Sequence, residues 1–466
     1  MKSSQSDLLQ ELARIVGSNW VKTEPGDLNN YGKDWTKVYP PNPIAAVLPA
    51  NIEEVVAIVK LANRYEVPLV PSGGRTGLSG GAVAGNRELV VVMDRMNRIK
   101  DFDASDMQVV CEAGVVTEQL QQFADEQDLF YPVDFASAGS SQIGGNVATN
   151  AGGIKVIRYG MTRNWVQGLK VVTGSGELLD LNRGLIKNAT GYDFRHLFIG
   201  SEGTLGIIVE VTLKLCSKPN DPSVMVLGIE NMAAAMPVLQ AFQNRLKLTA
   251  FEFFSEKALR HVVAEKGLTR PFATECEFYT LLEFENYSEQ DLDTAMAIFE
   301  SCGENGWVID GTISQNSSQA QNLWRLREDI SETIAKFIPY KNDISVKASR
   351  IPQFLQQVDE LVSNRYPDFE IIWFGHIGDG NVHLNILKPE SLPAQIFFDQ
   401  CASVSMEVFE LVQQHGGSIS AEHGVGLLKK PFLRYSRSAQ EIEYMRAIKR
   451  LFDPNNIMNP GKLVDG

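Results

Sequence analysis

Three glycine-rich segments in the first half of the chain constrain its fold more than any other feature. They are Pro71-Ser72-Gly73-Gly74-Arg75-Thr76-Gly77-Leu78-Ser79, the stretch from Gly139 to Gly153, and Gly200–Gly206. Glycine lets backbone N–H groups converge on an anion, and the serine and threonine hydroxyls add donors. Neither a GxGxxG nor a GxxxxGK[ST] pattern occurs, so a Rossmann or Walker-type site has no support. Three such loops favour a large phosphate-bearing cofactor over three unrelated tight turns.

The order of predicted elements indicates an α+β chain with two main domains. Residues 44 to about 217 alternate strands and helices, and the composition changes after Lys218-Pro219-Asn220. We therefore predict a first domain over residues 1–217, which includes an amphipathic N-terminal helix. A second domain, α+β in character, is predicted over residues 218–440. The tail, residues 441–466, is expected to pack back near the first domain.

As a set, PSGGRTGLSGG, GSSQIGGNVATNAGG and GSEGTLG resemble the FAD-binding fold of the vanillyl-alcohol oxidase type, over about residues 40–217. The resemblance implies FAD, with its pyrophosphate at the Ser72–Ser79 loop and its flavin ring near the Pro132–Asn150 and Gly203–Ile208 segments. It also implies that the second domain is a substrate (cap) domain with an antiparallel sheet. The implied cofactor-binding residues are Pro71, Ser72, Gly73, Gly74, Arg75, Thr76, Gly77, Leu78, Ser79, Pro132, Gly139, Ser140, Ser141, Gly144, Gly145, Asn146, Thr149, Asn150, Gly153, Glu202, Gly203, Gly206 and Ile208.

The FAD is expected to be non-covalent. Several members of this fold attach FAD through a histidine in the same half of the chain, but the first histidine here is His196. This excludes histidyl attachment near the pyrophosphate loop. Cys111 lies in an apolar strand and is predicted to belong to the core.

A histidine-bearing hairpin is predicted in the second domain. Two apolar strands within residues 371–387 flank Asp379-Gly380, a strong signal for a two-residue turn. With that turn, His376 and His383 lie directly opposite each other on one face, and Asn385 shares the face. Two such imidazoles can bind one metal ion, and Glu422 in the later SAEHGVG motif could complete a His2Glu set. Hydrogen-bonded core histidines are the alternative.

Cations that could hold an anionic substrate lie between residues 324 and 346. Residues 324–331 are predicted to be helical, so that Arg327 and Ser331 share a face, and Lys341 begins the next strand. A chain with a net charge of −14 needs converging cations to bind an acid. An ion-paired surface helix is the alternative.

The motifs GHIGDGNVHLN and SAEHGVG resemble the D-2-hydroxyacid dehydrogenase branch of that flavoprotein superfamily. This branch includes D-lactate dehydrogenases, glycolate oxidase subunits and D-2-hydroxyglutarate dehydrogenases. The resemblance implies a divalent metal, usually zinc, on His376, His383 and Glu422. It implies that His423 is the catalytic base, which also contacts the substrate.

The segment WRLREDIS followed by PYKND resembles the D-2-hydroxyglutarate dehydrogenase subgroup. In that subgroup the residues matching Arg327, Ser331 and Lys341 hold the distal carboxylate of the substrate. Asn385, on the predicted hairpin face, could donate to the substrate carboxylate or hydroxyl.

We therefore expect FAD- and metal-dependent oxidation of D-2-hydroxyglutarate to 2-oxoglutarate, with D-malate as a smaller substrate. A D-lactate dehydrogenase or a glycolate oxidase-type subunit is the alternative. A metal-dependent hydrolase would explain the histidines but not the glycine loops. The electron acceptor stays open between an electron-transfer flavoprotein, a quinone and a cytochrome.

Composition limits the partners and the location. The acidic balance disfavours nucleic acid, so small molecules are the expected ligands, and a homodimer is compatible with the sequence. Five scattered cysteines without CxxC indicate a reducing compartment. No run approaches the ~20 apolar residues of a spanning helix. We expect a cytoplasmic protein, with peripheral contact to the inner membrane left open.

Overall fold

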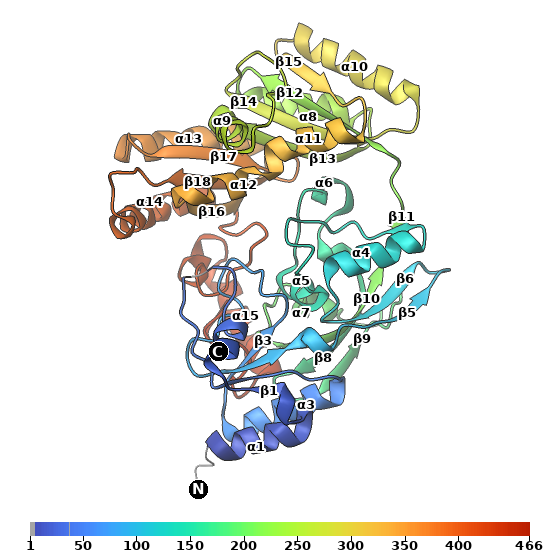
Figure 1. Ribbon diagram of the computed structural model, residues 1–466, viewed down its shortest axis with the longest axis vertical. Helices are drawn as coiled ribbons and strands as arrows, with labels where there is room; N and C mark the ends of the chain where they lie inside the picture. Colours follow the sequence, from blue (N-terminus) through green and yellow to red (C-terminus); the bar gives the residue numbers. More distant parts are fainter. Residues whose placement is uncertain (1–4, 37) are drawn as a thin grey trace. The chain divides into compact units, whose positions relative to one another are not determined.

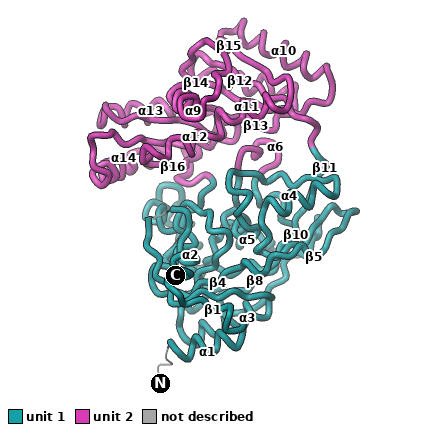
Figure 2. Tube along the Cα trace, in the orientation of Figure 1, with its two compact units in different colours: residues 1–152, 161–218, 422–466 teal, residues 153–160, 219–421 magenta. Residues whose placement is uncertain are grey.

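The computed structural model describes residues 5–36 and 38–466, and the chain divides into two compact units. Unit 1 comprises residues 1–152, 161–218 and 422–466, and unit 2 comprises residues 153–160 and 219–421 (Figure 2). These limits differ from the predicted domains in two places. Residues 153–160 belong to unit 2, and unit 1 resumes at residue 422 rather than at 441.

Both differences have local causes. Lys155 forms an ion pair with Glu283, and Arg158 forms one with Glu285 at 3.4 Å, so the short helix α6 (Val156–Tyr159) is attached to a strand of unit 2. Residues 425 and 426 are bound within unit 1, because both of their amides donate to the Glu202 carboxylate.

The first sheet of unit 1 has the strand order β1-β2-β4-β3, in which β2, β4 and β3 are parallel. Parallel strands need a crossover connection, and the helix α3 lies in the connection from β2 to β3, between which β4 lies in the sheet. Its apolar residues at helical spacing are buried, and Asn51 caps it by accepting from the Glu54 amide. The elements are β1 (Val21–Lys22), β2 (Ala45–Val47), α3 (Ile52–Tyr65), β3 (Leu69–Ser72) and β4 (Leu89–Val92), with α1 (Gln5–Val16) packed on α3.

The second sheet of unit 1 is antiparallel, with the order β5-β6-β10-β8-β9. Its inward residues include Cys111, which is fully buried, as predicted; burial raises the pKa of its thiol to about 12. The elements are β5 (Ile99–Asp103), β6 (Gln108–Glu112), β8 (Val166–Thr173), β9 (Leu178–Leu181) and β10 (Gly206–Lys214), together with α4 (Thr117–Glu126), α5 (Ile143–Thr149), α7 (Arg195–Phe198), α15 (Ala439–Phe452), and the pair β7 (Leu129–Phe130) and β11 (Cys216–Ser217).

Unit 2 is built on a seven-stranded antiparallel sheet, which confirms the predicted sheet type (Figure 1). Its order is β15-β12-β14-β13-β17-β18-β16. The strands are β12 (Pro222–Ile229), β13 (Leu248–Ser255), β14 (Phe278–Glu285), β15 (Val308–Ile313), β16 (Tyr340–Ser345), β17 (Glu370–Gly375) and β18 (Asn381–Leu387).

Helices cover this sheet. Apolar residues of α9, α11 and α12 form one core with Phe254, Ile372 and Phe374, so these helices define the face discussed below. On the opposite face, Trp373 donates to Asp359 of α13 at 2.8 Å. The helices are α8 (Ala235–Gln243), α9 (Glu256–Lys266), α10 (Glu289–Glu304), α11 (Ser317–Glu328), α12 (Ile330–Thr333), α13 (Ile351–Arg365) and α14 (Ala394–Gln414).

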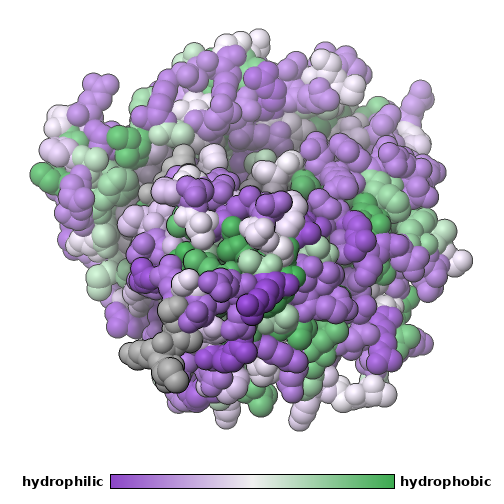
Figure 3. Space-filling model, turned by 60° about the horizontal axis from the view of Figure 1, so that its bottom comes forward, coloured by the Kyte–Doolittle hydropathy of each residue, from purple (hydrophilic) through white to green (hydrophobic). Residues whose placement is uncertain are grey.

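Among the residues that the structure describes, no helix combines the length and apolar character needed to cross a bilayer. On the face shown in Figure 3, hydrophilic residues prevail and hydrophobic ones form small groups separated by polar atoms.

Candidate active site

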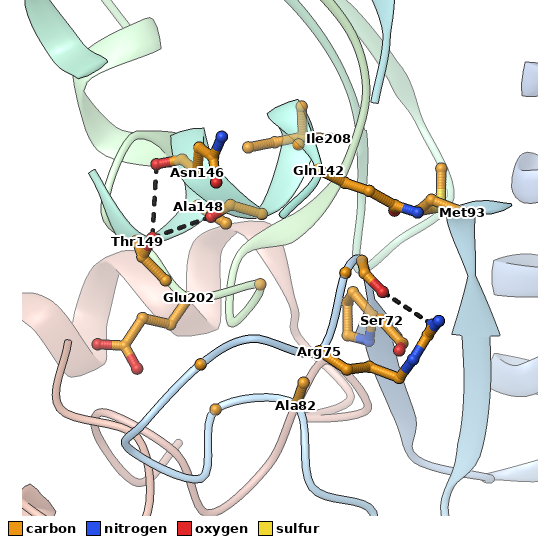
Figure 4. Close-up of a pocket in the computed structure, with 18 of the residues that line it drawn as sticks. Ser72, Arg75, Ala82, Met93, Gln142, Asn146, Ala148, Thr149, Glu202 and Ile208 are labelled. Carbon is orange, nitrogen blue, oxygen red and sulfur yellow. Dashed lines mark hydrogen bonds between the residues drawn. The ribbon is translucent and has the colours of Figure 1, made fainter. Parts of the chain in front are cut away.

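Unit 1 contains a pocket of about 920 Å³, including the part open to solvent, whose walls come mainly from the three glycine-rich segments. Figure 4 shows Ser72, Arg75, Gln142 and Glu202 around it, from separate parts of the chain. Its lining is Pro71, Ser72, Gly73, Gly74, Arg75, Thr76, Gly77, Ser79, Gly81, Ala82, Met93, Gln142, Gly144, Gly145, Asn146, Ala148, Thr149, Glu202, Gly203, Gly206, Ile207, Ile208 and His423.

Close backbone approach explains the glycines in these loops. A Cβ on Gly74 would lie 2.1 Å from the carbonyl oxygen of Ser140, so no larger residue fits there. A Cβ on Gly144 would lie 2.6 Å from the Cβ of Ala113, so this glycine lets α5 approach the end of β6. The second glycine segment therefore contains a helix, α5, that packs tightly against the sheet, and the first loop packs against the residues that precede this helix.

The walls of the pocket fit a polar, anionic ligand. The Ser72 hydroxyl is fully buried, and neither it nor Oε1 of Gln142 has a hydrogen-bond partner among the described residues. Buried polar atoms without partners are rare, and a bound ligand would satisfy them. Arg75 adds a guanidinium, held by its own bond to the Gly73 carbonyl at 2.8 Å and by Asp94 at 3.3 Å. FAD offers both the anionic pyrophosphate and the size for such a pocket.

Most, but not all, of the predicted cofactor residues line the pocket. Those that do not are Leu78, Pro132, Gly139, Ser140, Ser141, Asn150 and Gly153. Ser140 and Ser141 do not line the pocket themselves, but their backbone packs against Gly74, which does. Lining residues absent from the prediction include Gly81, Ala82, Met93, Gln142, Ala148 and Ile207. Of these, Gln142 carried a usable signal, because it lies between the predicted Ser141 and Gly144.

His423 lies on the wall of the same pocket. Its loop is held by Glu202, whose carboxylate accepts hydrogen bonds from the amides of Val425 and Gly426, both at 2.7 Å. Burial raises the pKa of Glu202, although these two amides act in the opposite direction. The predicted proton acceptor is therefore presented to the cofactor pocket by a residue that was predicted only to bind the cofactor.

The predicted pairing of the histidine hairpin is wrong. His383 pairs with Phe374, not with His376, because β17 ends at Gly375 and residues 376–380 form a five-residue loop. The amides of Asp379 and Asn381 both donate to the His376 carbonyl at 3.2 Å, which closes this longer turn. The two imidazole rings nevertheless lie close together, with their centroids 5.4 Å apart, because the loop brings His376 back toward His383.

The helix-covered face of the unit 2 sheet carries a row of polar side chains. His383 pairs with Asp343 across the strands, and Asn385 pairs with Lys341. Since alternate residues share a face, all four point to the side of Phe374.

Lys341 is a cation without an ion-pair partner among the described residues. Its ammonium donates to the Ser331 hydroxyl of α12 at 3.0 Å. Desolvation lowers the pKa of Lys341, because the surrounding protein displaces part of its hydration although the side chain remains accessible to solvent. An accessible, unpaired cation beside a hydroxyl is suited to bind a carboxylate.

Arg327 joins this face, but its environment was not predicted. The expected single helix over residues 324–331 is broken at Asp329 into α11 and α12. Arg327 is only 5% exposed, lies over the Phe374 ring at 4.7 Å, and forms an ion pair with Glu252 at 2.9 Å. The second oxygen of Glu252 lies 2.8 Å from Nδ1 of His376. The only signal for Glu252 was one acid within the apolar run LTAFEFFS.

Two of the three predicted metal ligands lie together in unit 2. A ring nitrogen of His376 lies within 4.8 Å of one of His383, which is close enough for both to bind one ion. The chemistry of the donors suits zinc, since both are imidazoles. Glu422, the third predicted ligand, is the first residue after unit 2.

Two family models match the chain, one in its N-terminal half and one in its C-terminal half. The model described as FAD binding domain matches residues 43–182, and the model described as FAD linked oxidases, C-terminal domain, matches residues 218–463. The chain belongs to this family of FAD-linked oxidases.

Curated relatives match almost the whole chain. A D-2-hydroxyglutarate dehydrogenase of Stutzerimonas stutzeri is 60% identical over 98% of each chain. One of Xanthomonas citri pv. viticola is 54% identical over 97% of this chain and 96% of the relative. A protein of Schizosaccharomyces pombe, provisionally named a mitochondrial D-lactate dehydrogenase, is 35% identical over 95% and 86%.

Solved structures share the fold. Alkyldihydroxyacetonephosphate synthase superposes with a TM-score of 0.74 at 18% identity, covering 98% of this chain and 85% of the other. The 4-ethylphenol oxidase of Gulosibacter chungangensis superposes with a TM-score of 0.75 at 16% identity, over 98% and 97%. These matches confirm the predicted vanillyl-alcohol oxidase-type fold.

Proposed function

We propose that this flavoenzyme oxidises D-2-hydroxyglutarate to 2-oxoglutarate and accepts D-malate less well. Relatives named for that activity, 60% and 54% identical over nearly the full length, support the substrate class. The observation that carries the choice of a diacid is Lys341, an accessible ammonium bonded to Ser331 and lacking a carboxylate partner among the described residues. A monocarboxylate such as lactate has no group for this cation.

Arg327, Ser331 and Lys341 would hold the distal carboxylate, and Asn385 the groups at C2. Nε of Arg327 is buried without a partner among the described residues, so it retains a donor for an incoming carboxylate. Asn385 is almost fully buried on the same face, which limits its amide to few orientations. These four side chains would fix the substrate before reaction, the usual role of positioning groups.

His423 would accept the proton of the C2 hydroxyl. Its place on the wall of the glycine-lined pocket supports this role, since the proton leaves the hydroxyl oxygen on C2 while the hydride leaves C2 itself. FAD, when bound, supplies the hydride acceptor. Glu202 keeps the His423 loop in place through its two amide hydrogen bonds.

His376, His383 and Glu422 would bind a divalent metal, zinc in the first instance. The metal would lower the pKa of the substrate hydroxyl, which is the chemistry that it supplies. The chain itself supports Glu422 as the third ligand. Ser418 exchanges backbone hydrogen bonds with Ser345, the residue at the end of β16 beside β18, and Glu422 follows only four residues later. Four extended residues span at most about 14 Å.

The electrons would leave the flavin to a non-NAD acceptor, an electron-transfer flavoprotein or a quinone. D-lactate oxidation is the second candidate, because one relative carries that provisional name.

The test is a screen of D-2-hydroxyglutarate, D-malate, D-lactate and the L-enantiomers with a dye acceptor. We expect kcat/KM to decrease in that order and anaerobic D-2-hydroxyglutarate to bleach the flavin. A preference for D-lactate would replace the proposal with the second candidate. Electron-transfer flavoprotein and a quinone analogue are then compared as acceptors for the reduced enzyme.

A further inference from the structure

Glu252 of β13 is a buried carboxylate that touches two candidate functional side chains at once. It is 1% exposed. Oε1 lies 2.8 Å from Nδ1 of His376, and Oε2 lies 2.9 Å from the Arg327 guanidinium. Its neighbour two residues on, Phe254, pairs with Phe374, which places Glu252 on the helix-covered face of the sheet.

We propose that Glu252 is a positioning residue that fixes the metal ligand His376 and the substrate anchor Arg327 through its two oxygens. This inference rests on the proposed function, in which His376 binds metal and Arg327 binds the distal carboxylate. Glu252 would contact neither the metal nor the substrate carboxylate, and it would act on them through His376 and Arg327.

The contact with His376 selects the ring nitrogen available to a metal. A carboxylate can only accept a hydrogen bond, so Nδ1 of His376 carries the proton and Nε2 is the unprotonated ring nitrogen. His383 also has a carboxylate near Nδ1: Oδ1 of Asp343 lies 3.7 Å away, too far for a hydrogen bond, and accepts from Asn381 at 2.9 Å. Carboxylates behind metal-binding histidines usually fix the ring in this manner.

The contact with Arg327 compensates a buried charge. A guanidinium that is 5% exposed needs a counterion, and Glu252 supplies it among the residues that the structure describes. Because one carboxylate serves both partners, displacing it disturbs the ligand and the anchor together.

The test is Glu252→Gln in the FAD-loaded enzyme. Glutamine removes the negative charge that faces both partners, and its amide turns an NH2 group toward either the His376 ring or the Arg327 guanidinium. We expect zinc affinity, measured by competition with a chelating dye, to fall 10- to 100-fold. At saturating zinc, KM for D-2-hydroxyglutarate should rise more than kcat falls. The matched control is Glu283→Gln, a buried acid on the neighbouring strand β14 that pairs with Lys155 instead.

Wild-type zinc affinity and KM in Glu252→Gln would overturn the proposal. A wild-type enzyme that binds no zinc or ignores D-2-hydroxyglutarate would instead refute the proposed function. A second measurement needs no variant: 15N NMR of ring-labelled, zinc-free wild type, with His376→Asn for assignment. An Nδ1–H tautomer of His376 supports the role of Glu252, and an Nε2–H tautomer overturns it, even if Glu252→Gln fails to fold.

Discussion

At the scale of single residues, burial separates the two cations that were predicted to have the same role. Arg327 is buried and paired with Glu252, whereas Lys341 is accessible and bonded only to a hydroxyl among the described residues. Removing Arg327 would leave the buried Glu252 carboxylate without a counterion beside His376, which would lower activity toward every substrate. Lys341 is therefore the cleaner test of diacid recognition.

For Lys341→Met we expect kcat/KM for D-2-hydroxyglutarate to fall about 10- to 150-fold, and kcat/KM for D-lactate to change little. The lost charge-assisted hydrogen bond is worth about 1.5–3 kcal/mol, and about 1.4 kcal/mol corresponds to one decade. Lactate has no carboxylate at that end. Steady-state kinetics with both acids make the comparison, with Lys336→Met as a control, since Lys336 pairs with Glu265 on the surface. Equal losses for both acids would contradict diacid recognition by Lys341.

The lowered pKa of Lys341 predicts a pH effect on diacid binding. Its ammonium is present below its pKa, and that pKa lies below the usual lysine value because of desolvation. KM for D-2-hydroxyglutarate should therefore rise with pH before an ordinary lysine loses its proton. Lys341→Arg stays charged and should lack this rise; pH profiles of KM for the two proteins decide.

His423→Ala should lower kcat by about 10²-fold or more, the usual cost of losing a general base. Flavin absorbance and zinc content should stay near wild type, because Glu422 rather than His423 is the proposed ligand. His415→Ala serves as the control, since His415 bonds to Gln357 and belongs to unit 2, whereas His423 belongs to unit 1. Loss of one zinc per chain in His423→Ala would make His423 a ligand instead.

At the scale of elements, the C-terminal segment braces the cofactor pocket. The Asn459 amide donates to the carbonyls of Gly81 at 2.9 Å and Glu202 at 2.7 Å, which joins two of the loops that line it. The helix before it is anchored by Lys449, which is buried and bonds to Asp453 and to the Thr204 carbonyl. Residues 441–466 thus support the loops that line the pocket, although they do not line it themselves.

Asn459→Asp should weaken FAD binding about 10- to 100-fold. It keeps the shape but replaces a donor to two carbonyls with a carboxylate that repels them, and each unmade buried bond costs about 1–3 kcal/mol. Fluorescence titration of apoprotein with FAD measures the change. Asn455→Asp is the control, because Asn455 is exposed and bonds to Asn63. Unchanged FAD affinity in Asn459→Asp would mean that the two loops hold their positions without it.

At the scale of the whole molecule, the candidate cofactor pocket and two of the three candidate metal ligands lie in different units. The glycine-lined pocket belongs to unit 1, and His376 and His383 belong to unit 2. Loss of the metal should therefore leave the flavin bound.

We expect chelation, or His376→Ala, to abolish turnover while the flavin spectrum persists, and added zinc to restore the chelated wild type but not the variant. Stopped-flow flavin reduction measures the effect. Wild-type reduction rates in metal-free protein would remove the metal from the proposed mechanism.

The sequence by itself determined the features that local patterns encode. Glycine spacing predicted the fold and most of the pocket wall, because backbone approach to an anion or to another segment tolerates no side chain, as Gly74 illustrates. Strand patterns located the hairpin, and the motif within it contains His376 and His383, both histidines of the proposed metal site. Their pairing was missed, because the Asp-Gly signal does not reveal that hydrogen bonds to the His376 carbonyl close a longer loop.

Only the tertiary structure decided which groups share charges. Glu252 lies 75 residues before Arg327 and 124 before His376, a separation at which no local pattern operates. Glu202 binds the amides of Val425 and Gly426 across a larger separation, 223 and 224 residues. Periodicity fixes which face a residue occupies, but the partner of a buried charge is set by the packing of distant strands, and that packing distinguishes a paired arginine from an unpaired lysine.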